Sequence, residues 1–513
     1  MIRHILTVST GTLASRLLGF SRDALMAALL GAGPVADAFL VAFQLINVAR
    51  RLLTEGALNA ALVPAYWRVR DRGGIAAAAA FAGRVLGTVS LAVFTAALVL
   101  GLVMPLAIAT LAPGFAGQPA FTDAIADARL MLPYLAFAGP VAVMMSLLNA
   151  EHRFALAAFS PLLFNLALIA ATVALLLWPH DPARAALLLA ATVGAAGLLQ
   201  LAVLAAGRAR RMALPIRIGA DSEMRGFFAS AIPGMIAGAA PQLLMIAAAV
   251  IASASPAAVS WLYFANRLIE LPLGIVGTAM GTVLVPELTR ATRDGEAAFA
   301  RAASRALELA VGLALPATLG LVLLGEPIVK LLFEHGAFTA ADSRATAAAL
   351  AWLALGLPAH VLAKVLAPGF FARGDTRTPM LATVSGLAVT VAAGFLLHGR
   401  FGSAGIAAAL ALAAWSSALH LMISAAAHSG LSIEPATRRR LPRIALAAAV
   451  MALLLWGAAG AAAPWLTGGP LGARAAAVGV AIAGGIIVYG AALALLGVIR
   501  LREIAAMRRR RPD

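Results

Sequence analysis

The feature that most constrains this chain is a succession of long apolar runs, bounded by charged residues or by prolines and glycines. A run of about 20 apolar residues is long enough to cross a bilayer as an α-helix. The sequence therefore predicts an all-α polytopic membrane protein. Its fourteen expected helical segments lie at residues 5–31, 36–63, 81–104, 129–150, 155–178, 185–206, 227–251, 257–288, 304–325, 346–371, 379–397, 403–427, 442–463 and 473–499.

Composition supports a membrane protein and excludes a soluble globular enzyme. Of 513 residues, 62% are hydrophobic and 12% are charged, and that charged share is roughly half that of a soluble domain. So little polar surface could not cover the apolar residues in water. The sequence has no cysteine, which excludes disulfides and thiolate metal sites. The histidines are scattered, so we expect no metal site. We also expect no cofactor and no catalytic residue.

The positive charge is distributed unevenly between the two sides of the predicted spans. The formal net charge is +17. Loops on the side of the N-terminus carry 26 Lys and Arg residues, whereas loops on the opposite side carry 6. The positive-inside rule then predicts that both termini are cytoplasmic. The cytoplasmic arginines are expected to contact anionic membrane lipids, which accounts for the charge without nucleic acid.

An internal repeat divides the chain. Residues 36–73 align without gaps on residues 258–295, and both segments contain Leu-Val-Pro at the same position. An even number of spans returns each half to the same orientation, so we predict two parallel six-helix repeats. The expected domains are an N-terminal lobe at 1–206, a cytoplasmic basic linker at 207–226, a C-terminal lobe at 227–427, and two further helices with a basic cytoplasmic tail at 428–513.

Of the seven basic residues that lie inside or at the edges of the predicted spans, four arginines are candidates for a site: Arg16, Arg22, Arg50 and Arg267. A lipid-facing arginine at mid-span costs about 2.5 to 3.5 kcal/mol on insertion scales, so these residues should face the protein interior. One interpretation is that they only pair with nearby carboxylates or extend to the membrane surface. The other is that they bind an anionic ligand, since the guanidinium group suits phosphate or pyrophosphate oxygens.

Further polar residues are expected to support these arginines in the same cavity. They are Asp23, Asp37, Gln44, Asn47, Glu55, Asn266, Glu270 and Lys364. By contrast, we expect Asp123 and Asp127 to lie in a solvated loop rather than in a site.

Four segments carry a resemblance to a known family: residues 15–24, residues 47–51 with Glu55, residues 266–272, and residues 364–373. They are similar to segments of the MurJ/MviN family of lipid II flippases, in the multidrug/oligosaccharidyl-lipid/polysaccharide exporter superfamily. The sequence departs from the family pattern at Gln44, which is often lysine, at Ile46, often proline, and at Asn266, often aspartate.

The resemblance implies a fold and a function. It implies two six-helix lobes around a V-shaped central cavity, with substrate-binding roles for Arg16, Arg22, Arg50 and Arg267 and a tail groove formed by the last two helices. It also implies a transporter of the bacterial cytoplasmic (inner) membrane. This transporter would flip lipid II, the undecaprenyl-pyrophosphate-linked peptidoglycan precursor, to the periplasmic leaflet by alternating access. The negative charge of the pyrophosphate further predicts that the membrane potential assists export, and cell-wall synthesis machinery is an expected partner.

The sequence leaves three other functions open. The cargo could be another polyprenyl-linked oligosaccharide or an amphipathic drug, although a cationic drug would favour acidic or aromatic residues over arginines. A membrane-embedded glycosyltransferase or polymerase would need loop carboxylates or a larger extramembrane region. A passive scaffold for cell-wall enzymes would not explain the arginines inside the spans.

Overall fold

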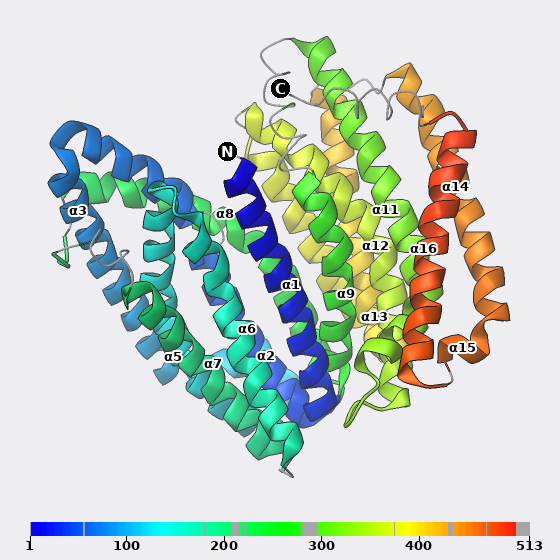
Figure 1. The fold of residues 1–513 in the computed structure, drawn as a ribbon, viewed down its shortest axis with the longest axis horizontal. Helices are drawn as coiled ribbons and strands as arrows, with labels where there is room; N and C mark the ends of the chain where they lie inside the picture. The colour runs from blue at the N-terminus through cyan, green and yellow to red at the C-terminus, as the bar shows by residue number, and fades with distance from the viewer. Residues whose placement is uncertain are drawn as a thin grey trace. The chain divides into compact units, whose positions relative to one another are not determined.

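The computed structural model describes residues 2–498, except 55–56, 179–180, 207–212, 214, 220, 280–286, 288–290, 292–294, 374, 429–433 and 468. Over these residues the regular secondary structure is helical throughout, as Figure 1 shows. The helices are α1 (Ile2–Leu30), α2 (Pro34–Thr54), α3 (Ala57–Leu102), α4 (Met104–Leu111), the short 3-10 helix η1 (Pro113–Phe115), α5 (Pro119–Ala150), α6 (Phe154–Leu177), α7 (Pro182–Ala206), α8 (Ser222–Ala252), α9 (Ala258–Ala279), α11 (Glu296–Phe333), α12 (Ala340–Ala372), α13 (Arg377–His428), α14 (Pro435–Ala461), α15 (Ala463–Thr467) and α16 (Leu471–Leu495).

The prediction of an all-helical membrane protein is confirmed. Each of the fourteen predicted segments overlaps a helix, and nine of the described helices are long and apolar enough to cross a membrane. Helices α1, α2 and α9, which carry the predicted arginines, are not among those nine. Charged and polar side chains interrupt their apolar surface.

Two helices change direction at a glycine in the left-handed region of backbone conformation. Gly402 has φ 55° and divides α13 into two antiparallel halves, and Ser417 Oγ donates a hydrogen bond across them to the Ala382 carbonyl at 2.8 Å. This turn matches the predicted break between residues 397 and 403. In α3 the corresponding residue is Gly74, with φ 76°. There residues 64–80, which were expected to be a loop between two spans, are helical on both sides of the kink.

The chain divides into two compact units. The first contains residues 1–260 with 335–339, and the second contains residues 261–334 with 340–513. The predicted lobe boundaries follow the sequence repeat instead, and they stay a prediction. The predicted V-shaped cavity concerns the placement of the two units and also stays a prediction.

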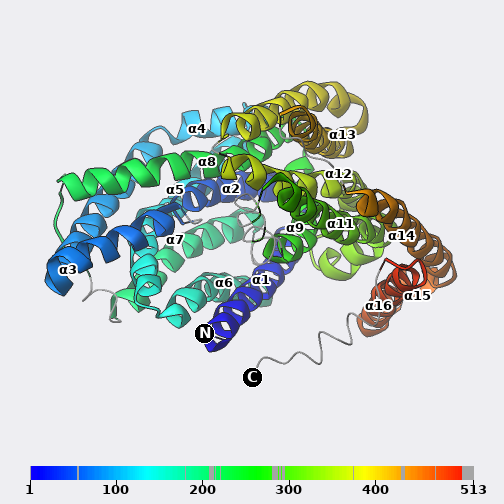
Figure 2. The ribbon, with the colours of Figure 1, turned by 90° about the horizontal axis from the view of Figure 1, so that it is seen from above.

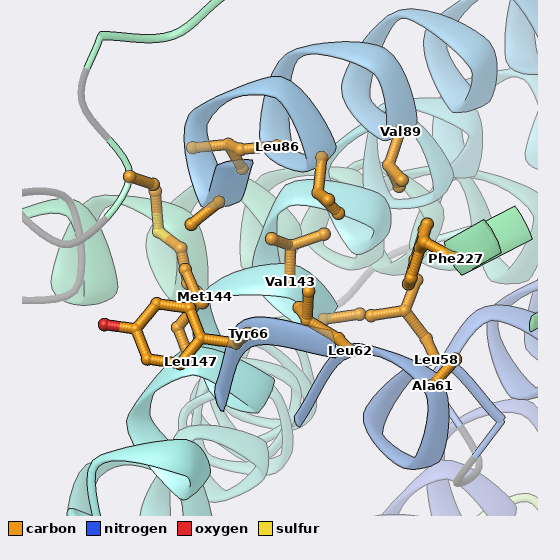
Figure 3. Packing of buried hydrophobic residues seen from close by; sticks show 14 of the residues in the cluster. Leu58, Ala61, Leu62, Tyr66, Leu86, Val89, Val143, Met144, Leu147 and Phe227 are labelled. Carbon is orange, nitrogen blue, oxygen red and sulfur yellow. The ribbon is translucent and has the colours of Figure 1, made fainter. Parts of the chain in front are cut away.

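The core of the first unit is formed where α3, α5 and α8 pack together. Figure 3 shows Leu62 of α3, Val143 of α5 and Phe227 of α8 converging in this cluster. All three side chains are almost completely buried. Helices α5, α6 and α7 lie side by side in the same unit (Figure 1). These packed helices hold the neighbours of the site described below.

A short distant segment completes the first unit by a close approach of two backbones. The Ala337 amide donates a hydrogen bond to the Ala28 carbonyl at 2.8 Å, close to the end of α1. Gly31 and Gly336 both have positive φ, and a Cβ at Gly31 would lie 2.6 Å from the Ala337 carbonyl oxygen. Only glycine fits both requirements at this contact. The contact explains why residues 335–339 belong to the first unit.

In the second unit, α12 packs against α11 and α13, and α14 and α16 lie beside α11 (Figure 2). The last helices are fastened to α11 by polar contacts. Tyr489 of α16 donates a hydrogen bond to the Gly312 carbonyl at 2.7 Å. Glu308 accepts hydrogen bonds from Thr437 at 2.5 Å and from Arg440 at 3.1 Å, both on α14.

Candidate functional site

The most completely enclosed arginine of the candidate site is Arg22 on α1. Its side chain is 8% exposed, and Nε and Nη2 both donate to Oδ1 of Asp23, at 2.8 and 2.6 Å. Asp23 is fully buried. Nη1 of Arg22 donates to Oδ1 of Asn165 on α6 at 3.0 Å. The guanidinium group therefore has a buried counter-ion and a second acceptor from another helix.

Two aromatic rings, and a hydrogen bond that orients Asn165, fix this guanidinium group in place. It lies 5.2 Å from the ring centroid of Phe43 on α2 and 5.7 Å from that of Phe164 on α6. Such contacts favour a cation over an aromatic face. Asn165 is itself oriented, because its side-chain amide donates to the Ser15 carbonyl at 3.1 Å. Side chains of α1, α2 and α6 thus surround the positive charge of Arg22.

The other two arginines of the first unit are more accessible than Arg22. Arg50 is half-buried on α2, and it acts electrostatically on Tyr134 of α5, as Arg22 does. Arg16 is exposed on α1, and within the described residues no hydrogen bond or ion pair holds its side chain. Gln44 and Asn47 are half-buried on α2, and positions 44, 47 and 51 share one helical face. Glu55 lies outside the described residues.

Asp37 lies apart from the arginines, at the beginning of α2. It is 1% exposed, and its Oδ1 accepts hydrogen bonds from the Ser260 amide at 2.8 Å and the Ser260 hydroxyl at 2.5 Å. Ser260 lies in the first turn of α9, where free amide groups favour a carboxylate. Asp37 therefore holds the beginning of α9 in the first unit.

The predicted site residues of the second unit lie on α9 and α12. Arg267 forms an ion pair with Glu270 one turn later, at 2.6 Å between Nη1 and Oε2. The two side chains are 24% and 35% exposed, so this pair is much more open than Arg22 and Asp23. Asn266 is half-buried and Lys364 is exposed.

The structure thus brings Arg22, Asp23 and Arg50 into one neighbourhood and places Arg267 with Glu270 in the other unit. A common cavity for all four arginines, and a substrate role for any of them, remain predictions. Sequence reasoning missed Asn165, Phe164 and Ser260. Asn165 could have been singled out as an amide inside an otherwise apolar predicted span, but its partner is 143 residues away.

One expectation about the acidic residues is wrong. Asp123 and Asp127 lie within α5, which begins at Pro119 rather than near residue 129. Asp127 is 1% exposed, so it is a buried side chain rather than part of a solvated loop. The mixed polar and apolar sequence of residues 119–128 has too few apolar residues to be recognised as a span. It nevertheless continues the helix, because every fourth residue from Ala120 to Ala128 is buried alanine.

The fold resembles two solved transporter structures. One is described as "Lipid II flippase MurJ, inward closed conformation", with a TM-score of 0.79 and 21% identity, covering 96% of this chain and 100% of that chain. The other is an inward-facing multidrug resistance MATE family transporter of the MOP superfamily, with a TM-score of 0.65 and 14% identity, covering 86% of this chain and 98% of that chain. At these identities the likeness shows the fold, which is that of a polytopic helical membrane protein.

The sequence comparisons give the family. A family model described as "Lipid II flippase MurJ" matches residues 26–471. The probable lipid II flippase MurJ of Rhizobium meliloti is 40% identical over 500 residues, covering 95% of this chain and 92% of that protein. The lipid II flippase MurJ of Burkholderia cenocepacia is 32% identical over 468 residues, covering 89% of each. The chain belongs to the lipid II flippase MurJ family, as the resemblance implied.

Proposed function

We propose that this protein carries lipid II from the cytoplasmic to the periplasmic leaflet by alternating access, and that its membrane-embedded arginines hold the pyrophosphate. Membership of the lipid II flippase family supports the cargo. Its pyrophosphate is an anion that guanidinium groups bind through paired hydrogen bonds.

The single observation that carries the proposal is the arrangement of cations on α1 and α2. Arg22 is neutralised and fixed by Asp23, whereas Arg16 is exposed on the same helix without a described partner. A lipid-facing arginine at mid-span would be costly, so an exposed one should face a wet cavity. We infer that Arg16 and Arg50 contact the headgroup and that Arg22 holds their helices in position.

The test is translocation of lipid II into the outer leaflet of proteoliposomes by the Arg16→Ala and Arg50→Ala variants. We expect each to lose at least tenfold in rate while keeping its expression level and unfolding temperature. Arg184→Ala is the matched control, since Arg184 is an exposed arginine of the same unit near the start of α7. Wild-type rates in both variants would refute the pyrophosphate assignment. Formation of a polymerised product instead of leaflet transfer would indicate a membrane-embedded glycosyltransferase or polymerase rather than a transporter.

We propose that the protein lies in the cytoplasmic membrane with both termini cytoplasmic. The uneven distribution of Lys and Arg supports this orientation. Because the chain has no cysteine, single cysteines can be placed at Ala209 and Gln118. An impermeant thiol reagent on intact cells should label position 118 and leave position 209 unlabelled. The opposite pattern would reverse the orientation.

We propose that the membrane potential assists export. A pyrophosphate diester carries about two negative charges, and one charge moved through 100 mV is worth about 2.3 kcal/mol. Because the cell interior is negative, outward movement of the headgroup is favourable. Collapse of the potential with a potassium ionophore at constant pH should slow translocation, and an unchanged rate would exclude this driving force.

A further inference from the structure

Asp127 carries a buried carboxyl group that has no role in the proposed binding of the pyrophosphate by arginines. It lies in the first third of α5 and is 1% exposed. Among the described residues, no side chain or backbone group donates a hydrogen bond to either of its carboxyl oxygens. An ionised carboxylate in such surroundings would lack any compensation for the loss of water.

The surroundings of Asp127 are apolar, and no described residue forms an ion pair with it. On α5 itself, Ala124 and Met131 lie one turn away and Ala128 is the next residue, and all three are fully buried. The elements α4 and η1 pack against this end of α5, and their large buried side chains are Met104, Ile108 and Phe115.

The charged groups on the elements packed against α5 do not neutralise Asp127. Helices α4, α6 and η1 contain no charged residue. Those on the other elements are Asp37, Arg50 and Arg51 of α2, Arg68, Arg70, Asp71, Arg72 and Arg84 of α3, and Arg184 of α7, while α5 itself adds Asp123 and Arg129. Asp123 lies one turn before Asp127 on the same helix, and it carries the same charge rather than an opposite one. None of the described salt bridges involves Asp127.

The corresponding helix of the second repeat offers a contrast. Helix α12 begins with a similarly buried acid, Asp342, which is 7% exposed. Its Oδ1 accepts a hydrogen bond from the indole of Trp261 at 3.0 Å. The buried acid at the start of α12 therefore has a donor, whereas the one near the start of α5 has none among the described residues.

From this geometry we propose that Asp127 is a proton-binding site, occupied as a neutral carboxylic acid in the arrangement described here. Release of the proton leaves a carboxylate. This ionised form becomes favourable only when water reaches the contact that α4 and η1 make with α5. The proton goes to that water. Among the described residues, Asp127 belongs to no group of three or more acidic or histidine side chains that could hold a metal ion.

The proposal predicts a pH dependence for opening of this contact. One proton bound in the closed arrangement and released in the open one changes their ratio by up to tenfold per pH unit. The inference concerns the same transporter as the proposed function. It can be tested without any substrate, so the two can fail separately.

The direct test is infrared difference spectroscopy of the purified full-length protein between acid and alkaline pH. The carbonyl band of a protonated carboxyl group in apolar surroundings should persist at neutral pH in the wild type. It should be missing in Asp127→Asn and retained in the matched control Asp342→Asn. An identical band in the wild type and in Asp127→Asn would overturn the proposal.

Thermal unfolding gives a second readout that needs no spectroscopic assignment. Asn mimics the neutral acid, so Asp127→Asn should match the wild type at acid pH. Its unfolding temperature should exceed that of the wild type progressively as pH rises, because keeping the acid neutral becomes more costly. A variant that is destabilised equally at every pH, or that fails to fold, would show that the carboxylate itself is needed and would contradict the proposal.

Discussion

Two arginines that the sequence assigns to one site have very different surroundings. Arg22 of the first unit is enclosed by a buried counter-ion, an amide and two aromatic rings. Arg267 of the second unit pairs with a carboxylate on its own helix, and both side chains keep about a quarter to a third of their surface exposed. The difference indicates two kinds of arginine. One is fixed as part of the fold, and the other remains accessible to a ligand.

The largest expected effect is on the buried pair. Asp23→Ala removes the counter-ion of Arg22 and should lower the free energy of unfolding by about 3 to 5 kcal/mol. Thermal unfolding in detergent would measure it. The double variant Arg22→Met with Asp23→Leu should recover most of that stability without recovering transport. If Asp23→Ala is as stable as the wild type, Arg22 is not fixed by this pair.

The second effect concerns the amide that orients Arg22. Asn165→Leu removes the acceptor of Nη1 and the donor to the Ser15 carbonyl. It should cost about 1 to 3 kcal/mol of stability, the usual penalty for buried polar groups left without a partner. Thr172→Val on the same helix is the control, since among the described residues Thr172 donates its hydroxyl hydrogen bond within its own helix, to the Leu168 carbonyl. Equal unfolding temperatures for the two variants would contradict the role given to Asn165.

A smaller effect is expected where Asp37 holds the first turn of α9. Ser260→Ala removes the hydroxyl donor but keeps the amide donor, and should cost about 1 kcal/mol. Hydrogen exchange of the amides at the start of α9 should become faster. The Ser230→Ala variant serves as the reference, because Ser230 is exposed and, in the described part of the chain, its hydroxyl donates to the Gly226 carbonyl of the preceding turn of α8. Unchanged exchange in Ser260→Ala would show that the hydroxyl contributes nothing.

The smallest effect is expected at the open pair. Glu270→Gln should change the unfolding free energy by about 0.5 kcal/mol or less, because partly exposed ion pairs contribute little. Its effect on transport could still be large if Arg267 needs this partner for its orientation. A stability loss similar to that of Asp23→Ala would remove the distinction between the two arginines.

The sequence predicted the helices well because most of them are long apolar runs, and it also located the turn of α13 before Ser403. It failed near the start of α5, where polar residues interrupt the pattern and Asp127 is nevertheless buried. Asn165, which contacts Arg22 from α6, was beyond sequence reasoning for another reason. Asn165 and Ser15 are far apart along the chain, and only the packing of α1 against α6 brings them together.

The central claim, that accessible arginines bind the pyrophosphate of a polyprenyl lipid, is tested most directly by measuring binding. Purified protein should bind lipid II and undecaprenyl pyrophosphate, and should bind undecaprenol, which lacks the pyrophosphate, far more weakly. The Arg16→Ala and Arg267→Ala variants should each lose at least tenfold in affinity, about 1.4 kcal/mol. The exposed control variants Arg184→Ala and Arg400→Ala should bind like the wild type. Equal binding of all three lipids, or unaltered affinity in both site variants, would contradict the claim.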